Sequence, residues 1–269
     1  MAYLVIVFCT LSFLRCAKTR AINAQLTIMF SIFKKKPLKV TDISWLGVDM
    51  HSHLLPGIDD GAKTLADSVS YIKALQDLGF EKLICTPHIF HELYPNSKET
   101  ISPALTLVKA ALEVANVGVV IDAAAEYMVD EHFEITGDLM CLPNNYLLIE
   151  MSYLNETPNI EQVIFNLQIK GYKVILAHPE RYNFYHKEHG RYRRLKDMGC
   201  LFQLNLLSVT GYYGKPVKLA AEYLLNKKLY DLAGTDLHHE QHLKVLQSAV
   251  QNGTLYANIG HYPFKNKML

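Results

Sequence analysis

The chain has 269 residues, a formal net charge of +1 and a hydrophobic content of 50%. This composition suits one or two globular domains with a large core, and the near-zero charge gives no electrostatic basis for binding nucleic acid or an anionic membrane surface. The five cysteines are odd in number and form no C-x-x-C pair, so neither a disulfide framework nor a zinc knuckle is expected. A reducing compartment fits this cysteine usage best.

Residues 1–14 are largely apolar, but the run is shorter than the roughly 20 residues of a membrane span. Basic residues follow the run instead of preceding it, unlike in a signal peptide, and Met29 opens a stretch typical of a cytoplasmic start. We therefore expect residues 1–44 to be an extension, disordered or in part (1–28) a mis-called start, before one domain over 45–269. A signal or anchor segment, with membrane association, is the alternative.

From Leu46 onward, strand-like apolar runs alternate with helical patterns. The strand-like runs cover residues 46–50, 82–86, 117–123, 146–150, 173–177, 201–205 and 230–234. Several are nearly continuous apolar stretches, which is typical of buried parallel strands. Helical spacing and glycine stops predict helices over residues 64–78, 102–115, 159–170, 192–198, 217–225 and 239–251.

This alternation predicts an α/β fold, either a β/α barrel or a doubly wound sheet. The sequence contains neither G-x-G-x-x-G nor G-x-x-x-x-G-K-[ST], the phosphate-binding motifs typical of nucleotide-binding sheets. We find no internal repeat and no interior linker, which favours one domain.

His51 and His53 follow the first strand-like run, one residue apart. Residues i and i+2 of a strand point to the same face, so both imidazoles can reach one divalent metal. Pro56 and Gly57 then break the strand, and Asp60 in the following loop could return an oxygen ligand to the same place. Two unrelated surface histidines and a solvated acidic turn are the alternative interpretation.

Polar side chains also follow the later strand-like runs, at the position where each run ends. They are His88, Glu126, Glu150, His178 with Arg181, and Asp236 with His238. Active sites of β/α barrels gather at the carboxyl ends of the strands, so these scattered residues would meet at one rim.

Imidazole and carboxylate ligands without cysteine suit catalytic Mn, Fe or Zn. The set exceeds one metal's needs, and Glu126 is the candidate for a bridging carboxylate, whereas Glu150 is expected to orient a histidine ligand. Arg181 offers a planar fork suited to phosphate; a surface ion pair with Glu180 is the alternative. His239 and His242 are expected on a helix surface.

The segments D-M-H-S-H, D-D-G, T-P-H, A-E-Y, A-H-P-E-R-Y and T-D-L-H together resemble the polymerase-and-histidinol-phosphatase (PHP) superfamily, and within it the CpsB/CapC branch. The resemblance covers about residues 45–262. It implies a distorted seven-stranded, TIM-like β/α barrel holding two or three ions, Mn²⁺ first, with Fe, Zn or Mg as other choices. The ligands that it implies are His51, His53, Asp60, His88, Glu126, His178, Asp236 and His238.

The resemblance implies a manganese-dependent protein tyrosine phosphatase of bacterial capsule or exopolysaccharide synthesis, in which metal-activated hydroxide attacks phosphorus and Arg181 receives the phosphate. The expected substrate is the tail of a membrane-bound tyrosine kinase, met by a cytoplasmic enzyme for which a homo-oligomer is one option. A phosphatase of a small metabolite such as histidinol phosphate is the alternative.

Two features bear on the substrate. The C-x5-R loop of thiol phosphatases is absent, which excludes a cysteine nucleophile of that type. The aromatics Tyr127, Tyr182, Tyr212 and Tyr213 follow strand-like runs and could line a phosphotyrosine pocket, with Tyr127 as the substrate-binding candidate, or they could pack the rim.

Overall fold

The computed structural model describes residues 39–135 and 137–269, so the predictions for residues 1–38 lie outside it. Its strands form two sheets in which every pairing is parallel. One sheet has the order β1 (Val48–Asp49), β2 (Lys82–Cys85), β4 (Val120–Ala123). The other has the order β3 (His88–Ile89), β5 (Glu126–Met128), β6 (Tyr146–Glu150), β7 (Lys173–Leu176), β8 (Leu201–Asn205), β9 (Leu232–Gly234).

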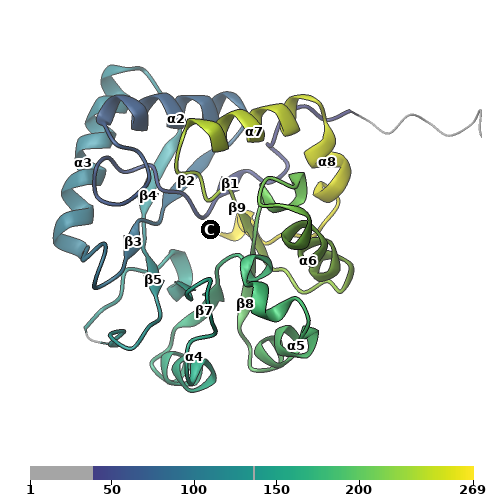
Figure 1. The fold of residues 1–269 in the computed structure, drawn as a ribbon. Coiled ribbons are helices and arrows are strands. Elements are labelled where there is room, and N and C mark those ends of the chain that lie inside the picture. The colour runs from purple at the N-terminus through teal and green to yellow at the C-terminus, as the bar shows by residue number, and fades with distance from the viewer. Residues whose placement is uncertain (1–38, 136) are drawn as a thin grey trace, which may run out of the picture. The chain divides into compact units, whose positions relative to one another are not determined.

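Backbone hydrogen bonds connect the two sheets on both sides. Only residues 86–87 separate β2 from β3, and only residues 124–125 separate β4 from β5, with the Glu126 amide donating to the Pro87 carbonyl across this break. On the other side, Ser52 and Leu237 form a parallel bridge, and the Asp236 amide donates to the His51 carbonyl over 2.8 Å. The parallel sheet therefore curls round on itself (Figure 1), as in a barrel and unlike a flat doubly wound sheet.

Helices lie around the outside of the curled sheet (Figure 1). They are α2 (Leu65–Asp77), α3 (Lys98–Val114), α4 (Ile160–Ile169), α5 (His189–Asp197), α6 (Lys215–Asn226), α7 (Glu240–Gln251) and α8 (Thr254–Ile259). The predicted start of α3, residue 102, lies four residues after the observed start at Lys98. Ser97 begins the helix instead through a capping box with Thr100, and Pro103 lies inside it. The helix α8 was not predicted, since six residues show little periodicity.

Side-chain alternation along the strands divides the core into two apolar layers. On β6, Leu148 faces a small interior cluster with Val48, Ile84 and Ile175, whereas its neighbours Leu147 and Ile149 belong to the large cluster that includes buried helix residues. The buried Asn266 donates to the backbone carbonyls of Val48 and Ala233 next to this interior cluster. Among the described residues, no helix has the length and apolar content that crossing a bilayer requires.

Candidate metal centre

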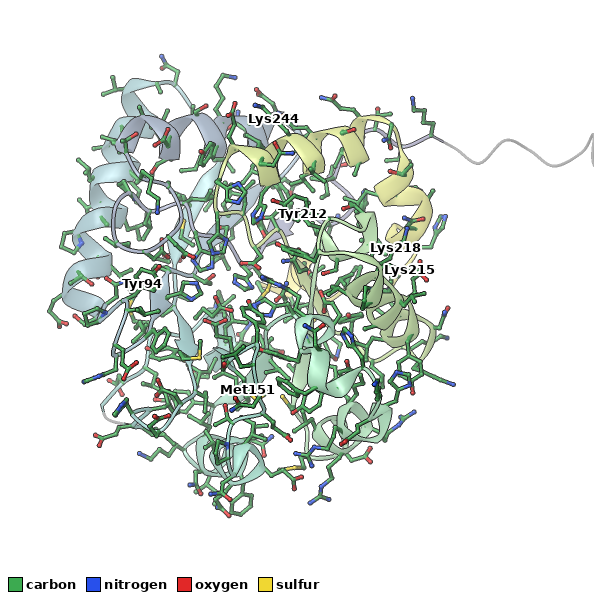
Figure 2. The ribbon with its side chains drawn as sticks, in the orientation of Figure 1. Tyr94, Met151, Tyr212, Lys215, Lys218 and Lys244 are labelled. Atoms are coloured by element: carbon green, nitrogen blue, oxygen red, sulfur yellow. The ribbon has the colours of Figure 1, made fainter. Side chains whose placement is uncertain are left out.

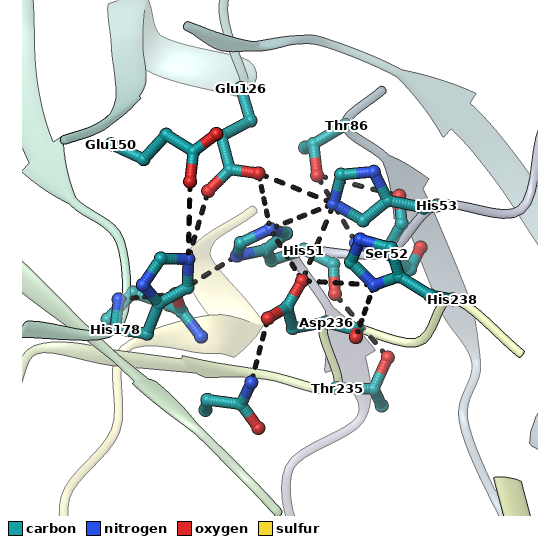
Figure 3. A network of polar contacts seen from close by, with 12 residues as sticks. His51, Ser52, His53, Thr86, Glu126, Glu150, His178, Thr235, Asp236 and His238 are labelled. Atoms are coloured by element: carbon teal, nitrogen blue, oxygen red, sulfur yellow. Dashed lines mark hydrogen bonds and ion pairs between the residues drawn. The ribbon is translucent and has the colours of Figure 1, made fainter. Parts of the chain in front are cut away.

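Four side-chain atoms converge where β1 and β9 end (Figure 3). The Nε2 atoms of His51 and His53 lie 3.2 Å apart. Glu126 Oε2 lies 3.1 Å from His51 Nε2 and 3.3 Å from His53 Nε2, and Asp236 Oδ1 lies 3.2 Å and 3.4 Å from the same two nitrogens. All four residues are buried. Two imidazole nitrogens that face each other without water need either a proton or a cation between them.

Two further groups of possible ligands adjoin this one. Asp60 Oδ1 lies 3.5 Å from both His88 Nε2 and His238 Nε2, and these three residues form a group with His53. The third group contains His88, Glu126 and Glu150, with His88 Nδ1 at 2.9 Å from Glu150 Oε1. Glu126 belongs to two of the three groups, as a bridging carboxylate would.

His178 lies beside these groups, with its Nε2 atom 3.2 Å from Glu126 Oε1. Its Nδ1 atom is buried and has no hydrogen-bond partner among the described residues. Both His178 and Asp236 have left-handed backbone, with φ of 33° and 49°. Such conformations cost of order 1–3 kcal/mol for residues other than glycine, and they persist where the surrounding structure imposes them. The strain therefore coincides with the strand ends that carry these two side chains.

Two residues that the sequence did not single out orient the first histidines. Asp59 Oδ2 lies 2.8 Å from His53 Nδ1, and Gln203 Oε1 lies 3.0 Å from His51 Nδ1. Such contacts fix which ring nitrogen of a histidine faces a metal. The D-D-G turn passes close to the backbone of His53: a Cβ on Gly61 would lie 2.1 Å from the His53 carbonyl oxygen, so only glycine fits there. The D-D-G motif could have revealed Asp59; Gln203, on β8, left no comparable signal.

Charge compensation dominates the electrostatics of the cluster. Burial alone would lower the pKa of His51, but the carboxylates of Glu126 and Asp236 outweigh it and raise the pKa. Burial alone would raise the pKa of Glu126, yet the surrounding histidines hold it well below the ordinary value. The pKa of His238 is well below its usual range, through burial and the nearby charge of His53. The carboxylates are thus ready to act as anionic ligands.

The distances fit a divalent cation. Bonds of about 2.1 Å in a tetrahedral arrangement separate neighbouring ligand atoms by about 3.4 Å. The separations around His51 and His53 run from 3.1 to 3.4 Å. The donor atoms are imidazole nitrogens and carboxylate oxygens without sulfur, a set that suits exchangeable catalytic ions.

Arg181 lies at the edge of the cluster, in the turn after β7. Its Nη1 donates to Asp236 Oδ2 over 2.7 Å, and Asp236 is its hydrogen-bond partner among the described residues. The alternative pairing with Glu180 is wrong: Glu180 is fully buried and accepts hydrogen bonds from the Asn205 amide, the Ser208 hydroxyl and the Tyr230 hydroxyl. Four of the five guanidinium N–H donors remain for other partners.

A cavity of about 740 Å³ opens over these groups, with Arg181 and His238 among its lining residues. Tyr94, which Figure 2 labels, lines it too, together with Tyr153 and Tyr213. The structure does not bring Tyr127 there, because its side chain points away from Glu126 on β5 and its hydroxyl accepts from the Met140 amide.

Two other predicted pocket tyrosines, and one histidine predicted at a helix surface, are placed as follows. Tyr182 is fully buried, and its hydroxyl accepts a hydrogen bond from the Met151 amide. Tyr212 packs edge-on against Tyr213. His242, expected on a helix surface, is buried and lines the cavity, because the first turn of α7 faces the strand ends.

The cysteines of the described part are poor nucleophiles. Burial raises the pKa of Cys85 and Cys200 to about 12 and that of Cys141 to about 11. Thiolates are the reactive form, so these side chains are chemically inert near neutral pH.

A curled parallel α/β fold with imidazole and carboxylate groups at its strand ends defines a class of proteins built around a metal centre. Within that class, the chain belongs to the CpsB/CapC family of capsular polysaccharide synthesis, whose sequence model matches residues 47–251. The resemblance in the motifs is thereby confirmed.

Two individual relatives and one solved structure illustrate this similarity. The tyrosine-protein phosphatase YwqE of Bacillus subtilis is 28% identical over 198 residues, covering 71% of this chain and 77% of that protein. The tyrosine-protein phosphatase CpsB of Streptococcus pneumoniae is 29% identical over 202 residues, covering 71% and 83%. A crystal structure of YwqE and CpsB, described as metal-dependent tyrosine phosphatases, superposes with a TM-score of 0.71 at 26% identity, covering 80% of this chain and 89% of that one.

Proposed function

We propose that this chain is a metal-dependent protein tyrosine phosphatase of capsule or exopolysaccharide synthesis. The observation that carries the proposal is the group of buried ligand atoms from His51, His53, Glu126 and Asp236, with Arg181 held at its edge. The tyrosine-protein phosphatase activity of the relatives YwqE and CpsB supports the substrate class.

The proposed ligands are the set expected from the sequence: His51, His53, Asp60, His88, Glu126, His178, Asp236 and His238. Glu126 would bridge two ions, since it belongs to two ligand groups. Glu150 lies as close to His88 as an orienting acceptor would, which supports its role beside the ligands. We propose Mn²⁺, two or three ions, as the native occupant because hard oxygen and imidazole ligands suit it.

When bound there, divalent ions would polarise the phosphoryl oxygens and activate water for attack on phosphorus. The residues of the chain do the remaining work. Asp236 holds one edge of the Arg181 guanidinium, which leaves donors of the fork for the non-bridging oxygens of the phosphate. The cavity admits an aromatic ester, and a phenolate with a pKa near 10 needs little protonation to leave.

Counting the interrupted pairs β2/β3 and β4/β5 as single strands gives seven, and we propose the distorted seven-stranded PHP barrel on this count. We likewise propose a phosphatase domain over residues 45–269. The proposed substrate is the tail of a membrane-bound tyrosine kinase, met on the cytoplasmic side. A small metabolite such as histidinol phosphate is not favoured, because the named relatives are protein phosphatases.

Chelation tests the proposal. After exhaustive EDTA treatment the protein should lose hydrolysis of a phosphotyrosine peptide, and added Mn²⁺ should restore it. Histidinol phosphate is the comparison substrate. Cys85→Ser and Cys200→Ser serve as controls and should keep activity, since their thiols are buried and protonated. Turnover that survives metal removal, or that disappears in a folded cysteine variant, would contradict the proposal.

A further inference from the structure

The guanidinium of Arg181 lies close to two aromatic rings. Its Cζ atom is 4.6 Å from the centroid of Tyr153 and 4.3 Å from that of Tyr213. Both aromatic residues line the cavity over the candidate metal centre. A guanidinium at such distances from an aromatic ring is attracted to its π face, and more strongly where water is excluded.

The two tyrosines are held in different ways. Tyr213 is held by a hydrogen bond: its hydroxyl accepts from the Asn205 side chain, which also donates to Asp236. Tyr153 lies on the segment after β6, is 39% exposed, and its hydroxyl makes no hydrogen bond among the described residues. The contact of Tyr153 with Arg181 is made by its ring.

The segment that carries Tyr153 is anchored at both ends. The Met151 amide donates to the Tyr182 hydroxyl over 3.0 Å, and Figure 2 labels Met151 where this segment leaves β6. At the other end, the Tyr185 hydroxyl donates to Glu156 over 2.6 Å, and the Thr157 hydroxyl donates to the Val129 carbonyl over 2.6 Å. These contacts place the Tyr153 ring over Arg181.

We propose that Tyr153 is a positioning residue, whose ring holds the Arg181 guanidinium against Tyr213 so that its free donors face the phosphate. This inference rests on the proposed phosphate-binding role of Arg181. Asp236 fixes the Nη1 atom of Arg181, but a single hydrogen bond leaves the guanidinium plane free to rotate about the Nη1–Oδ2 axis. Two rings in contact with the guanidinium restrict that rotation, and a fork fixed before binding loses less entropy when it binds.

The test measures binding of inorganic phosphate to the Mn²⁺-loaded protein by calorimetry, together with kcat and KM for a phosphotyrosine peptide. Tyr153→Leu should weaken phosphate binding about tenfold, the size of a desolvated cation–π contact, with unchanged metal content. Tyr153→Phe keeps the ring and should behave as the unchanged protein. Tyr153→Met provides a second variant without an aromatic face, should the leucine variant fold poorly.

Tyr146→Leu is the matched control. Tyr146 lies at the opposite end of β6 and also contacts a cation, with Lys173 Nζ 5.0 Å from its ring centroid. Removing this ring should leave phosphate binding unchanged. In an Arg181→Ala background, Tyr153→Leu should add almost no further loss, because Tyr153 acts through Arg181.

Three results would overturn the proposal: unchanged phosphate binding in Tyr153→Leu and Tyr153→Met, an equal loss in Tyr153→Phe, or a full additional loss in the Arg181→Ala background. A protein that hydrolyses no phosphotyrosine peptide, yet shows the expected pattern of phosphate binding, would support Tyr153 as a positioning residue while rejecting the proposed function.

Discussion

Two aspartates flank the short strand β9, and their surroundings differ in kind. Asp231 precedes the strand and is bonded by the ammonium groups of Lys196 and Lys265 and by the Phe202 amide. Asp236 follows the strand, and two of its neighbours, His51 and His53, are titratable imidazoles. Two lysines neutralise Asp231, whereas Asp236 faces, besides the Arg181 guanidinium, imidazoles whose charge depends on a proton or a metal ion.

The comparison shows that the two ends of one strand carry different kinds of charged groups. Charges at the amino end of β9 are paired permanently, next to the apolar interior cluster that contains Leu232. At the carboxyl end, Asp236 has a left-handed backbone conformation and its side chain lines the cavity. We therefore expect variants at the carboxyl end to change catalysis and variants at the amino end to change stability.

The largest effect is expected for Asp236→Asn. Loss of an anionic ligand should lower kcat/KM by about 10³-fold or more, since bound metal contributes several kcal/mol to the transition state. Metal content, measured by mass spectrometry, should fall in parallel. Asp231→Asn is the matched control at the other end of the strand. An Asp236→Asn protein that keeps both metal and rate would refute the proposed division.

Arg181→Ala comes second. Loss of one donor that stabilises developing charge costs about 10²–10³-fold in rate, and Arg181→Lys should restore little because an ammonium lacks the fork. Metal content should stay normal, in contrast to Glu126→Gln, in which occupancy and rate should fall together. Normal turnover in both Arg181 variants would remove the arginine from the mechanism.

The third effect concerns stability alone. Asp231→Asn leaves the partly buried Lys196 without its anionic partner, and an unsatisfied group of this kind costs at most about 1–3 kcal/mol. Chemical denaturation should show this loss, while kcat/KM and metal content remain those of the unchanged protein. A loss of turnover in a folded Asp231→Asn protein would show that the two ends of β9 are not independent.

The sequence revealed most of this arrangement because strand ends carry a strong local signal. His51, His53, His88, Glu126, His178, Asp236 and His238 each follow an apolar run, and parallel strands bring such positions to one rim. The predicted ranges for β6 and β8 also match the structure. Whether these residues bind metal stays a prediction.

What the sequence did not reveal depends on contacts between distant segments. Gln203 meets His51 across 152 positions, and Tyr153 reaches Arg181 from a loop without any regular pattern. Tyr127 was misplaced because the count of residues after an apolar run does not say to which face a side chain points. Glu126 and Tyr127 are neighbours on the short strand β5, so their side chains point to opposite faces of the sheet. Glu126 faces the candidate metal centre, and Tyr127 therefore faces away from it.

The smallest effect should appear in the pH dependence of the Asp231 contribution. Burial alone would raise the pKa of Asp231, but hydrogen bonds from Lys196 and Lys265 outweigh it and lower the pKa below the ordinary value. A carboxyl with a lowered folded-state pKa stabilises the fold fully above its unfolded value of about 3.9 and loses that contribution as pH falls through the folded value. The stability difference between the unchanged protein and Asp231→Asn should thus be constant from pH 7 to about pH 5 and shrink below about pH 4. Denaturation at several pH values measures it, and a difference that grew on acidification would show that the lysines do not stabilise this carboxylate.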